Sequence, residues 1–267
     1  MTQAGPLAQT LDDIEVLWRV TVGPHESDRD TPRVEWRPPM KKSLSDYKIA
    51  WVDGWPNHPV SGQISGAIKE LVGKLQQQGC QVENRSPEGN LHEESLALGM
   101  GIFPYMVAQG FPWFVRLFLK MDLNSKVFKA ANEHRKEYDK AFGMAANYYG
   151  EMMLRRKITV SRWDRFFANR DFLICPSRFG PACARTKVGS KLRYEGTKVT
   201  YSEYVWPFMA CFNASGHPAL NIPLRLGKEG LPLGVQIVGP YWSEPKLINF
   251  AKQVSQLTLG FVKPSGY

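Results

Sequence analysis

The sequence predicts an α/β fold in which a mixed β-sheet is flanked by helices. A strand, a helix, a glycine and a second strand follow one another over residues 48–83, which is typical of a parallel βαβ unit. Residues 219–224 and 233–238 read as two further strands on either side of a turn. The 267 residues are 43% hydrophobic and 22% charged, a composition that excludes a disordered chain.

The N-terminal elements follow from hydrophobic spacing. Residues 7–22 have apolar side chains at helical intervals, with Thr10 as the expected cap. Residues 48–52 (KIAWV) form the expected first strand, residues 60–78 an amphipathic helix that ends at Gly79, and residues 80–83 the next strand.

The middle of the chain is expected to be a mostly helical insertion at about 91–170 within a single unit of residues 1–267. Two helices are predicted in it, at 127–149 and at 159–169, the second capped by Thr159 or Ser161. Residues 171–175 then predict a strand that ends at Cys175.

The C-terminal elements are a hairpin, a helix and a final helix. Residues 191–201 predict a hairpin around Glu195 and Gly196. Residues 203–214 predict a helix with Pro207 in its first turn, and residues 243–257 a helix capped by Ser243.

Charge and hydropathy exclude two classes of partner. The net charge is +9, but the basic residues are dispersed among acids and apolar positions, so a solvated surface is predicted and not a nucleic-acid site. The uncharged run at 95–115 contains prolines and glycines and makes a poor membrane span. Contact with a membrane surface is a weaker alternative, based on aromatic side chains next to a basic stretch: Phe111, Trp113, Phe114 and Phe118.

Neither a metal nor a cofactor is expected. The four cysteines have no C-x-x-C spacing, and with no signal peptide visible they favour a reducing, cytoplasmic location. The five histidines are scattered, and the run His92, Glu93, Glu94 predicts surface charge rather than a metal site.

Cys175 is the sharpest isolated candidate for chemistry. It ends a strand, where nucleophiles of α/β enzymes are often placed, and the arrangement resembles that of nitrilase-type hydrolases. The acidic residue and the aromatic residue that usually follow such a cysteine are missing. A buried strand cysteine is the favoured interpretation.

Five segments in order carry a resemblance to a known family: AGPLAQTLDDIEVLWRVTVGPHESDRD, KIAWV with QGCQVE, DFLICPSRFGPA, YEGTKVTY, and FNASGHPALNIPL followed by GLPLGVQIVGPYWSEPKLINFAKQV. Together they resemble the C-terminal half of the amidase signature family, whose members hydrolyse carboxamide C–N bonds. The resemblance covers essentially the whole chain and implies an incomplete amidase-signature-like sheet.

The resemblance also implies where the catalytic groups lie. The family's Ser nucleophile, second Ser and Lys base precede its G-P-L-A segment, which here starts at Gly5. We therefore expect this chain to lack the catalytic segment, and no catalytic residue is assigned. The serines and glycines of residues 61–66 match a non-catalytic helix of the family instead.

Substrate-binding residues are implied by the same resemblance. Tyr204, Trp206, Phe208 and Cys175 match parts of the family that line the substrate pocket, and the aromatic residues suit a small, mainly apolar amide. Three hypotheses stay open beside the nitrilase-like one: an inactive fragment, one part of a split enzyme completed by a partner chain or oligomer, and a non-catalytic binding protein.

Overall fold

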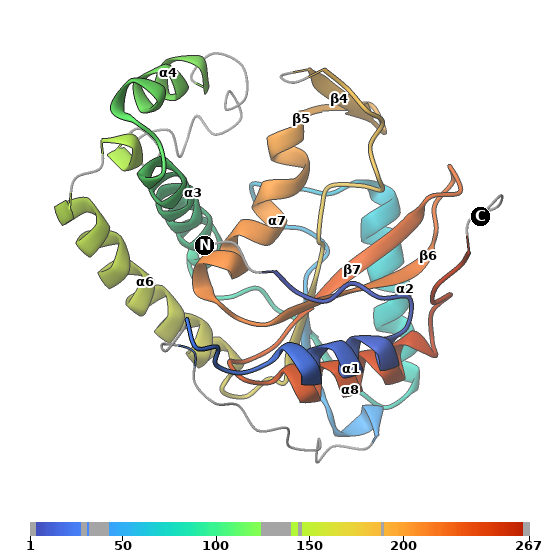
Figure 1. Cartoon of the computed structure of the whole chain (residues 1–267). Coiled ribbons are helices and arrows are strands. Elements are labelled where there is room, and N and C mark those ends of the chain that lie inside the picture. The colour runs from blue at the N-terminus through green and yellow to red at the C-terminus, as the bar shows by residue number, and fades with distance from the viewer. Residues whose placement is uncertain are drawn as a thin grey trace.

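The computed structural model describes residues 4–27, 31, 43–123, 140–143, 146–187 and 190–263. At its centre lies a five-stranded sheet with the strand order β2-β1-β3-β7-β6 (Figure 1). Strands β1, β2 and β3 are parallel, whereas β7 is antiparallel to both β3 and β6. The predicted mixed sheet flanked by helices is therefore confirmed. The strand bounds are β1 (Lys48–Trp51), β2 (Gln81–Asn84), β3 (Phe172–Cys175), β6 (Ala219–Leu226) and β7 (Pro232–Val238).

The βαβ unit forms as the sequence predicts. Helix α2 (Gly62–Gln77) begins after Ser61, whose hydroxyl accepts a hydrogen bond from the backbone N–H of Ile64. Gly79 follows the helix with a φ of +81°, a conformation that glycine adopts at little cost.

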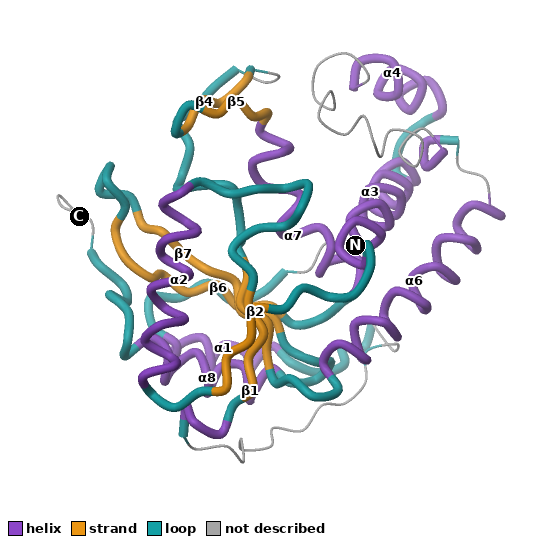
Figure 2. Tube along the Cα trace, turned by 180° about the vertical axis from the view of Figure 1, so that it is seen from behind, coloured by secondary structure: helices purple, strands orange, loops and turns teal. Residues whose placement is uncertain are grey.

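Each face of the sheet is covered by its own set of helices. One face packs against α2 and α8 (Glu244–Ser255), and the other against α6 (Ala146–Phe167) and α7 (Tyr201–Ser215). Alternation along β3 divides the two layers, because Ile174 points to the first and Cys175 to the second. Figure 2 shows this arrangement from behind.

Helix α1 (Leu11–Thr21) lies beside α8 rather than on the sheet (Figure 1). Thr10 caps it, as predicted, by accepting a hydrogen bond from the N–H of Asp13 at 3.1 Å. Lys252 of α8 forms ion pairs with Asp12 and, at 2.6 Å, with Glu15. No residue of α1 is buried, so one broad face of this helix stays open.

The helical region consists of α3 (Leu91–Gln109), α4 (Trp113–Leu123) and α6. The separate helix predicted at 159–169 is wrong: α6 runs straight through Thr159 and Ser161. Thr159 is itself buried, on the same face as Met152 and Trp163, so the apolar face continues across the expected boundary. The predicted helix at 127–149 lies largely outside the described residues.

Helix α7 begins earlier than predicted. Thr200 and Glu203 form a capping box at its start, which places Pro207 inside the helix instead of in its first turn. The hairpin before it, β4 (Lys191–Tyr194) with β5 (Thr197–Thr200), turns at Glu195 and Gly196 as predicted. Ser243 precedes α8, but its hydroxyl donates to the carbonyl of Pro240 and does not cap the helix.

Within the described residues, no helix is long and apolar enough to cross a membrane. This agrees with the prediction that the prolines and glycines of residues 95–115 make a poor span. Those residues supply much of α3, which packs against α6 and α7.

The crossing of α3 and α7 depends on Gly99, and this gives a first prediction. A Cβ added there would lie 2.9 Å from the backbone oxygen of Ala210. Since this backbone atom cannot move aside cheaply, Gly99→Ala is expected to lower the free energy of unfolding by about 1–3 kcal/mol. Urea denaturation measures the change.

Gly73→Ala is the matched control for that substitution. Gly73 lies in α2 with no atom within 4 Å of an added Cβ. There the variant is expected to stabilise the protein by about 0.5–1 kcal/mol, because alanine favours the helix. Equal effects at the two glycines would contradict the close packing of α3 on α7.

Candidate functional site

Cys175 ends β3 with its side chain fully buried between the sheet and α7. The side-chain amide of Gln236 lies 3.6 Å from its sulfur and also donates to the carbonyl of Phe208 at 3.1 Å. Burial raises the pKa of the Cys175 thiol to about 12. The thiol is therefore protonated and inaccessible, which agrees with the favoured interpretation and argues against a nitrilase-like nucleophile.

Tyr204 and Phe208 lie in the same buried cluster as Cys175. The hydroxyl of Tyr204 donates to the carbonyl of Pro181 at 2.7 Å, and its carbonyl accepts from the N–H of Phe179 at 2.8 Å. Burial raises the pKa of this phenol well above its usual range. Both bonds attach α7 to the segment that follows β3.

Trp206 points to a different part of the molecule. It is only partly buried and packs against the cluster of Leu96, Met100 and Ala210 between α3 and α7. Its ring meets that of Phe103 edge to face, with centroids 5.4 Å apart. Of the four residues expected to bind substrate, the structure brings three together and leaves Trp206 apart from them.

The turn after α7 is held by long polar side chains. Gly216 ends the helix with a φ of +85°. Arg156 of α6 donates to the carbonyls of Ala214 at 2.8 Å and Ser215 at 3.3 Å, and the Tyr241 hydroxyl donates to the second of these. The segment from α7 into β6 is therefore fixed by contacts from two distant parts of the chain.

The serines near residue 61 have structural partners. Ser61 caps α2 and is buried, and the hydroxyl of Ser65 donates to Asp53 at 2.6 Å. The N–H of Gly62 donates to the carboxylate of Glu195 at 2.6 Å, which joins the start of this helix to the β4–β5 hairpin. These contacts suit a helix start, in line with the non-catalytic match expected for this stretch.

A cavity of about 470 Å³ opens away from these residues, between the segment after β2 and the end of α6. Four arginines line it, and three of them pair with nearby carboxylates: Arg85 with Glu83 and Glu88, Arg162 with Glu94, and Arg170 with Glu83. Because acidic partners already offset most of this positive charge, the cavity does not resemble the apolar amide pocket that the sequence predicts.

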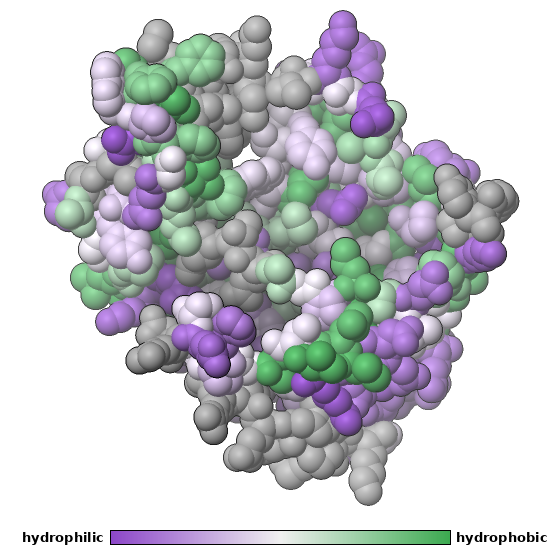
Figure 3. All heavy atoms as spheres, in the orientation of Figure 1, coloured by the Kyte–Doolittle hydropathy of each residue, from purple (hydrophilic) through white to green (hydrophobic). Residues whose placement is uncertain are grey.

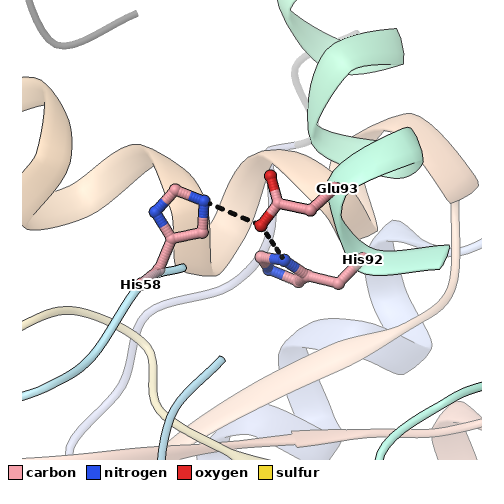
Figure 4. Close-up of side chains that lie close together, drawn as sticks. All are labelled: His58, His92 and Glu93. Atoms are coloured by element: carbon pink, nitrogen blue, oxygen red, sulfur yellow. Dashed lines mark ion pairs between the residues drawn. The ribbon is translucent and has the colours of Figure 1, made fainter. Parts of the chain in front are cut away.

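Three further polar residues converge at the start of α3. His92 is buried, with 5% of its surface exposed, which corrects the expectation that His92, Glu93 and Glu94 form a surface charge cluster. Figure 4 shows the carboxylate of Glu93 between the rings of His58 and His92. Oε1 of Glu93 lies 3.0 Å from Nε2 of His58 and 3.6 Å from Nδ1 of His92.

Sequence reasoning had no means of finding this cluster. His58 lies 34 positions before His92, in the loop after β1, and no spacing rule links two such residues. The fold joins them because a short backbone bridge between Trp55 and His58 turns that loop towards α3.

Comparisons with known proteins agree on one family. The sequence model of the Amidase family matches residues 1–248. The chain is 26% identical to a subunit of the glutamyl-tRNA(Gln) amidotransferase of Pseudomonas savastanoi pv. phaseolicola, over 97% of this chain and 55% of the relative. The corresponding subunit of Neisseria gonorrhoeae is 25% identical, over 94% of this chain and 54% of its own length.

Solved structures share the fold at low sequence identity. A protein of a vestigial complex that bears on the origins of an s-triazine catabolic enzyme gives a TM-score of 0.73 at 16% identity, covering 97% of this chain and 54% of its own. The corresponding glutamyl-tRNA(Gln) amidotransferase subunit of Thermotoga maritima gives 0.68 at 17%, covering 96% and 52%. The chain thus spans about half the length of the relatives it matches. On the family match, this chain belongs to the amidase family.

Proposed function

We propose that these residues form the C-terminal half of an amidase-type hydrolase that cleaves carboxamide C–N bonds. The observation that carries the proposal is the partial coverage, 97% of this chain against 55% of the matched relative. The family's Ser, Ser and Lys groups precede the segment that matches Gly5, so residues 1–267 have no catalytic segment of their own. Without a nucleophile, a base and oxyanion donors they are inactive alone.

We further propose that α7 and the end of β3 form walls of the substrate pocket. Tyr204, Phe208 and Cys175 are packed into one buried layer, which suits a rigid wall behind a small apolar amide. Trp206 keeps part of its surface exposed and offers the more direct contact with a substrate.

The open face of α1 supports a partner or a further segment that completes the enzyme. Hydrophobic side chains gather over α1 on the face shown in Figure 3. Leu7 is 94% exposed, Val20 79% and Val16 60%. Apolar surface of this kind marks an interaction site more often than a free solvent-facing helix. A cytoplasmic location is part of the same proposal, since all four cysteines are free thiols.

An assay of amide hydrolysis tests the proposal. The purified chain is expected to show no turnover of simple or aryl amides. Co-expression with a polypeptide that carries the Ser, Ser and Lys segment of a family member is expected to give hydrolysis that a Ser-directed covalent inhibitor abolishes. The same polypeptide without this chain is the control and is expected to be inactive.

Two outcomes would change the assignment. Turnover by this chain alone that survives Ser-directed inhibitors and is lost in Cys175→Ala would contradict the proposal and favour a nitrilase-like hydrolase. Binding of an amide without turnover, even in the reconstituted pair, would identify a non-catalytic binding protein derived from an amidase.

A further inference from the structure

His58, His92 and Glu93 come from two separate elements and meet below the surface. His92 and Glu93 lie in the first turn of α3, and His58 lies in the loop that follows β1. The three ligand atoms that face each other all lie within 4.8 Å of one another. No other group of three His, Cys, Asp or Glu side chains in the described part of the chain comes as close.

A backbone hydrogen bond fixes the tautomer of His92. Its Nε2 lies 2.8 Å from the carbonyl oxygen of Pro207, and because that oxygen only accepts, Nε2 must carry the proton. In the neutral ring, Nδ1 therefore presents a lone pair. Burial lowers the pKa of His92, which favours this neutral form. Metal-binding histidines commonly donate their second ring N–H to a backbone carbonyl in this way.

That lone pair faces a carboxylate oxygen, which is an unfavourable arrangement without a cation between them. Nδ1 of His92 lies 3.6 Å from Oε1 of Glu93, too far for a hydrogen bond. Nε2 of His58 approaches the same oxygen at 3.0 Å without the alignment of a hydrogen bond. Both ring nitrogens are buried and have no hydrogen-bond partner among the described residues.

The indole of Trp55 holds the site in place from the other side. Its ring stacks on that of His92 with centroids 4.0 Å apart and an angle of 15° between the planes. The ring of His92 is thus fixed by a stack on one face and by the Pro207 carbonyl at its edge. A ligand that is held in advance loses little freedom when it binds an ion.

We propose that His58 Nε2, His92 Nδ1 and Glu93 Oε1 bind one Zn²⁺ ion. Two imidazole nitrogens and one carboxylate oxygen form a donor set that zinc accepts, with a fourth position left for water or another ligand. Donors about 2.0–2.1 Å from a tetrahedral zinc lie roughly 3.3 Å apart. The observed separations of 3.0 and 3.6 Å lie on either side of that value. The ion would join the loop after β1 to α3 and, through Pro207, to α7.

This site is distinct from the amidase chemistry proposed above, and its test does not depend on hydrolysis. The chain is first treated with a chelator and then titrated with ZnCl₂ by calorimetry, and separately with Co²⁺ while the visible d–d absorption is recorded. One equivalent of metal is expected to bind, with the absorption of a four-coordinate cobalt site and a higher melting temperature.

Substitutions at the ligands show whether this site holds the ion. His58→Gln and Glu93→Gln change partly exposed side chains and are each expected to weaken zinc binding at least about tenfold. His25→Gln, at an exposed histidine, and Cys183→Ser, at a thiol that is not fully buried, are the controls and are expected to bind as the wild type does. Melting temperatures of the metal-free variants verify that each is folded.

Three results would overturn the proposal. The first is the absence of stoichiometric zinc binding. The second is equal affinity in the wild type, His58→Gln and Glu93→Gln. The third is a ¹⁵N NMR spectrum near neutral pH in which Nδ1 of His92 is protonated and does not respond to zinc, which would identify a buried ion pair with Glu93 instead.

Discussion

Trp163→Ala is expected to lower the free energy of unfolding by about 3–5 kcal/mol, among the largest effects of any single substitution in this chain. Trp163 lies in α6 with none of its surface exposed. Its ring packs against Phe212 of α7 at 5.2 Å between centroids, and against Phe166 and Phe167 of its own helix. Removing the indole leaves a cavity where α6, α7 and the sheet meet.

A hydrogen bond adds to that cost. The indole Nε1–H donates to the hydroxyl of Ser95 at 2.9 Å, which joins α6 to α3. Trp163→Phe keeps most of the apolar volume and loses this bond, so a smaller loss of about 1 kcal/mol or more is expected. Comparing the two variants by urea denaturation separates the packing from the hydrogen bond.

Trp113→Ala serves as the matched control. Trp113 is 70% exposed in α4, and its removal is expected to change the free energy of unfolding by no more than about 0.5 kcal/mol. A Trp163→Ala protein as stable as the Trp113→Ala protein would contradict the packing of α6 on α7.

The stability of the protein is expected to fall by about 3 kcal/mol between roughly pH 6.5 and pH 4 because of His217 alone. Burial, and secondly the charge of Arg156, lower the pKa of His217 to about 4. In the unfolded chain a histidine has a pKa of about 6.5. The unfolded state therefore binds the proton more readily, so the contribution is complete above pH 6.5 and is lost as the pH falls through the folded pKa.

The neighbours of His217 explain why its neutral form is retained. The carboxylate of Asp164 lies 3.5 Å from Nε2, but this side chain is 53% exposed and the attraction is screened by water. Nδ1 lies 3.1 Å from the hydroxyl of Ser215. The loss of hydration of the buried ring therefore outweighs the attraction of one exposed carboxylate.

Urea denaturation at several pH values between 7 and 4 measures this dependence. His217→Gln is expected to flatten the curve in that window, although only in part, because burial also lowers the pKa of His92. His25→Gln is the control and is expected to keep the wild-type slope. Identical slopes in the wild type and His217→Gln would show that His217 is solvated or already charged in the folded protein.

The comparison of sequence and structure separates local signals from tertiary ones. The start of α1 at Thr10, the glycine after α2 and the turn at Glu195 were all predictable, because each depends on backbone bonding within a few residues. The boundary predicted near Thr159 was wrong for a related reason. A residue suited to capping sits there, but the packing of α6 on its neighbours continues the helix past it.

The start of α7 shows the same competition within a local signal. Proline favours the first turn of a helix, which placed the start of this helix near Pro207. The capping box of Thr200 and Glu203 satisfies the first backbone N–H groups earlier in the chain. The helix begins there and accommodates the proline in its interior.

The sequence by itself determined the mixed α/β fold, the order of its segments and their resemblance to half of an amidase, since hydrophobic periodicity and ordered motifs are properties of the chain. Only the tertiary structure decided that Cys175 is an inaccessible thiol, that Trp206 lies apart from Tyr204, and that His58 meets His92. Burial and proximity depend on which elements pack together. That packing follows from contacts between residues far apart in the chain, which no local pattern encodes.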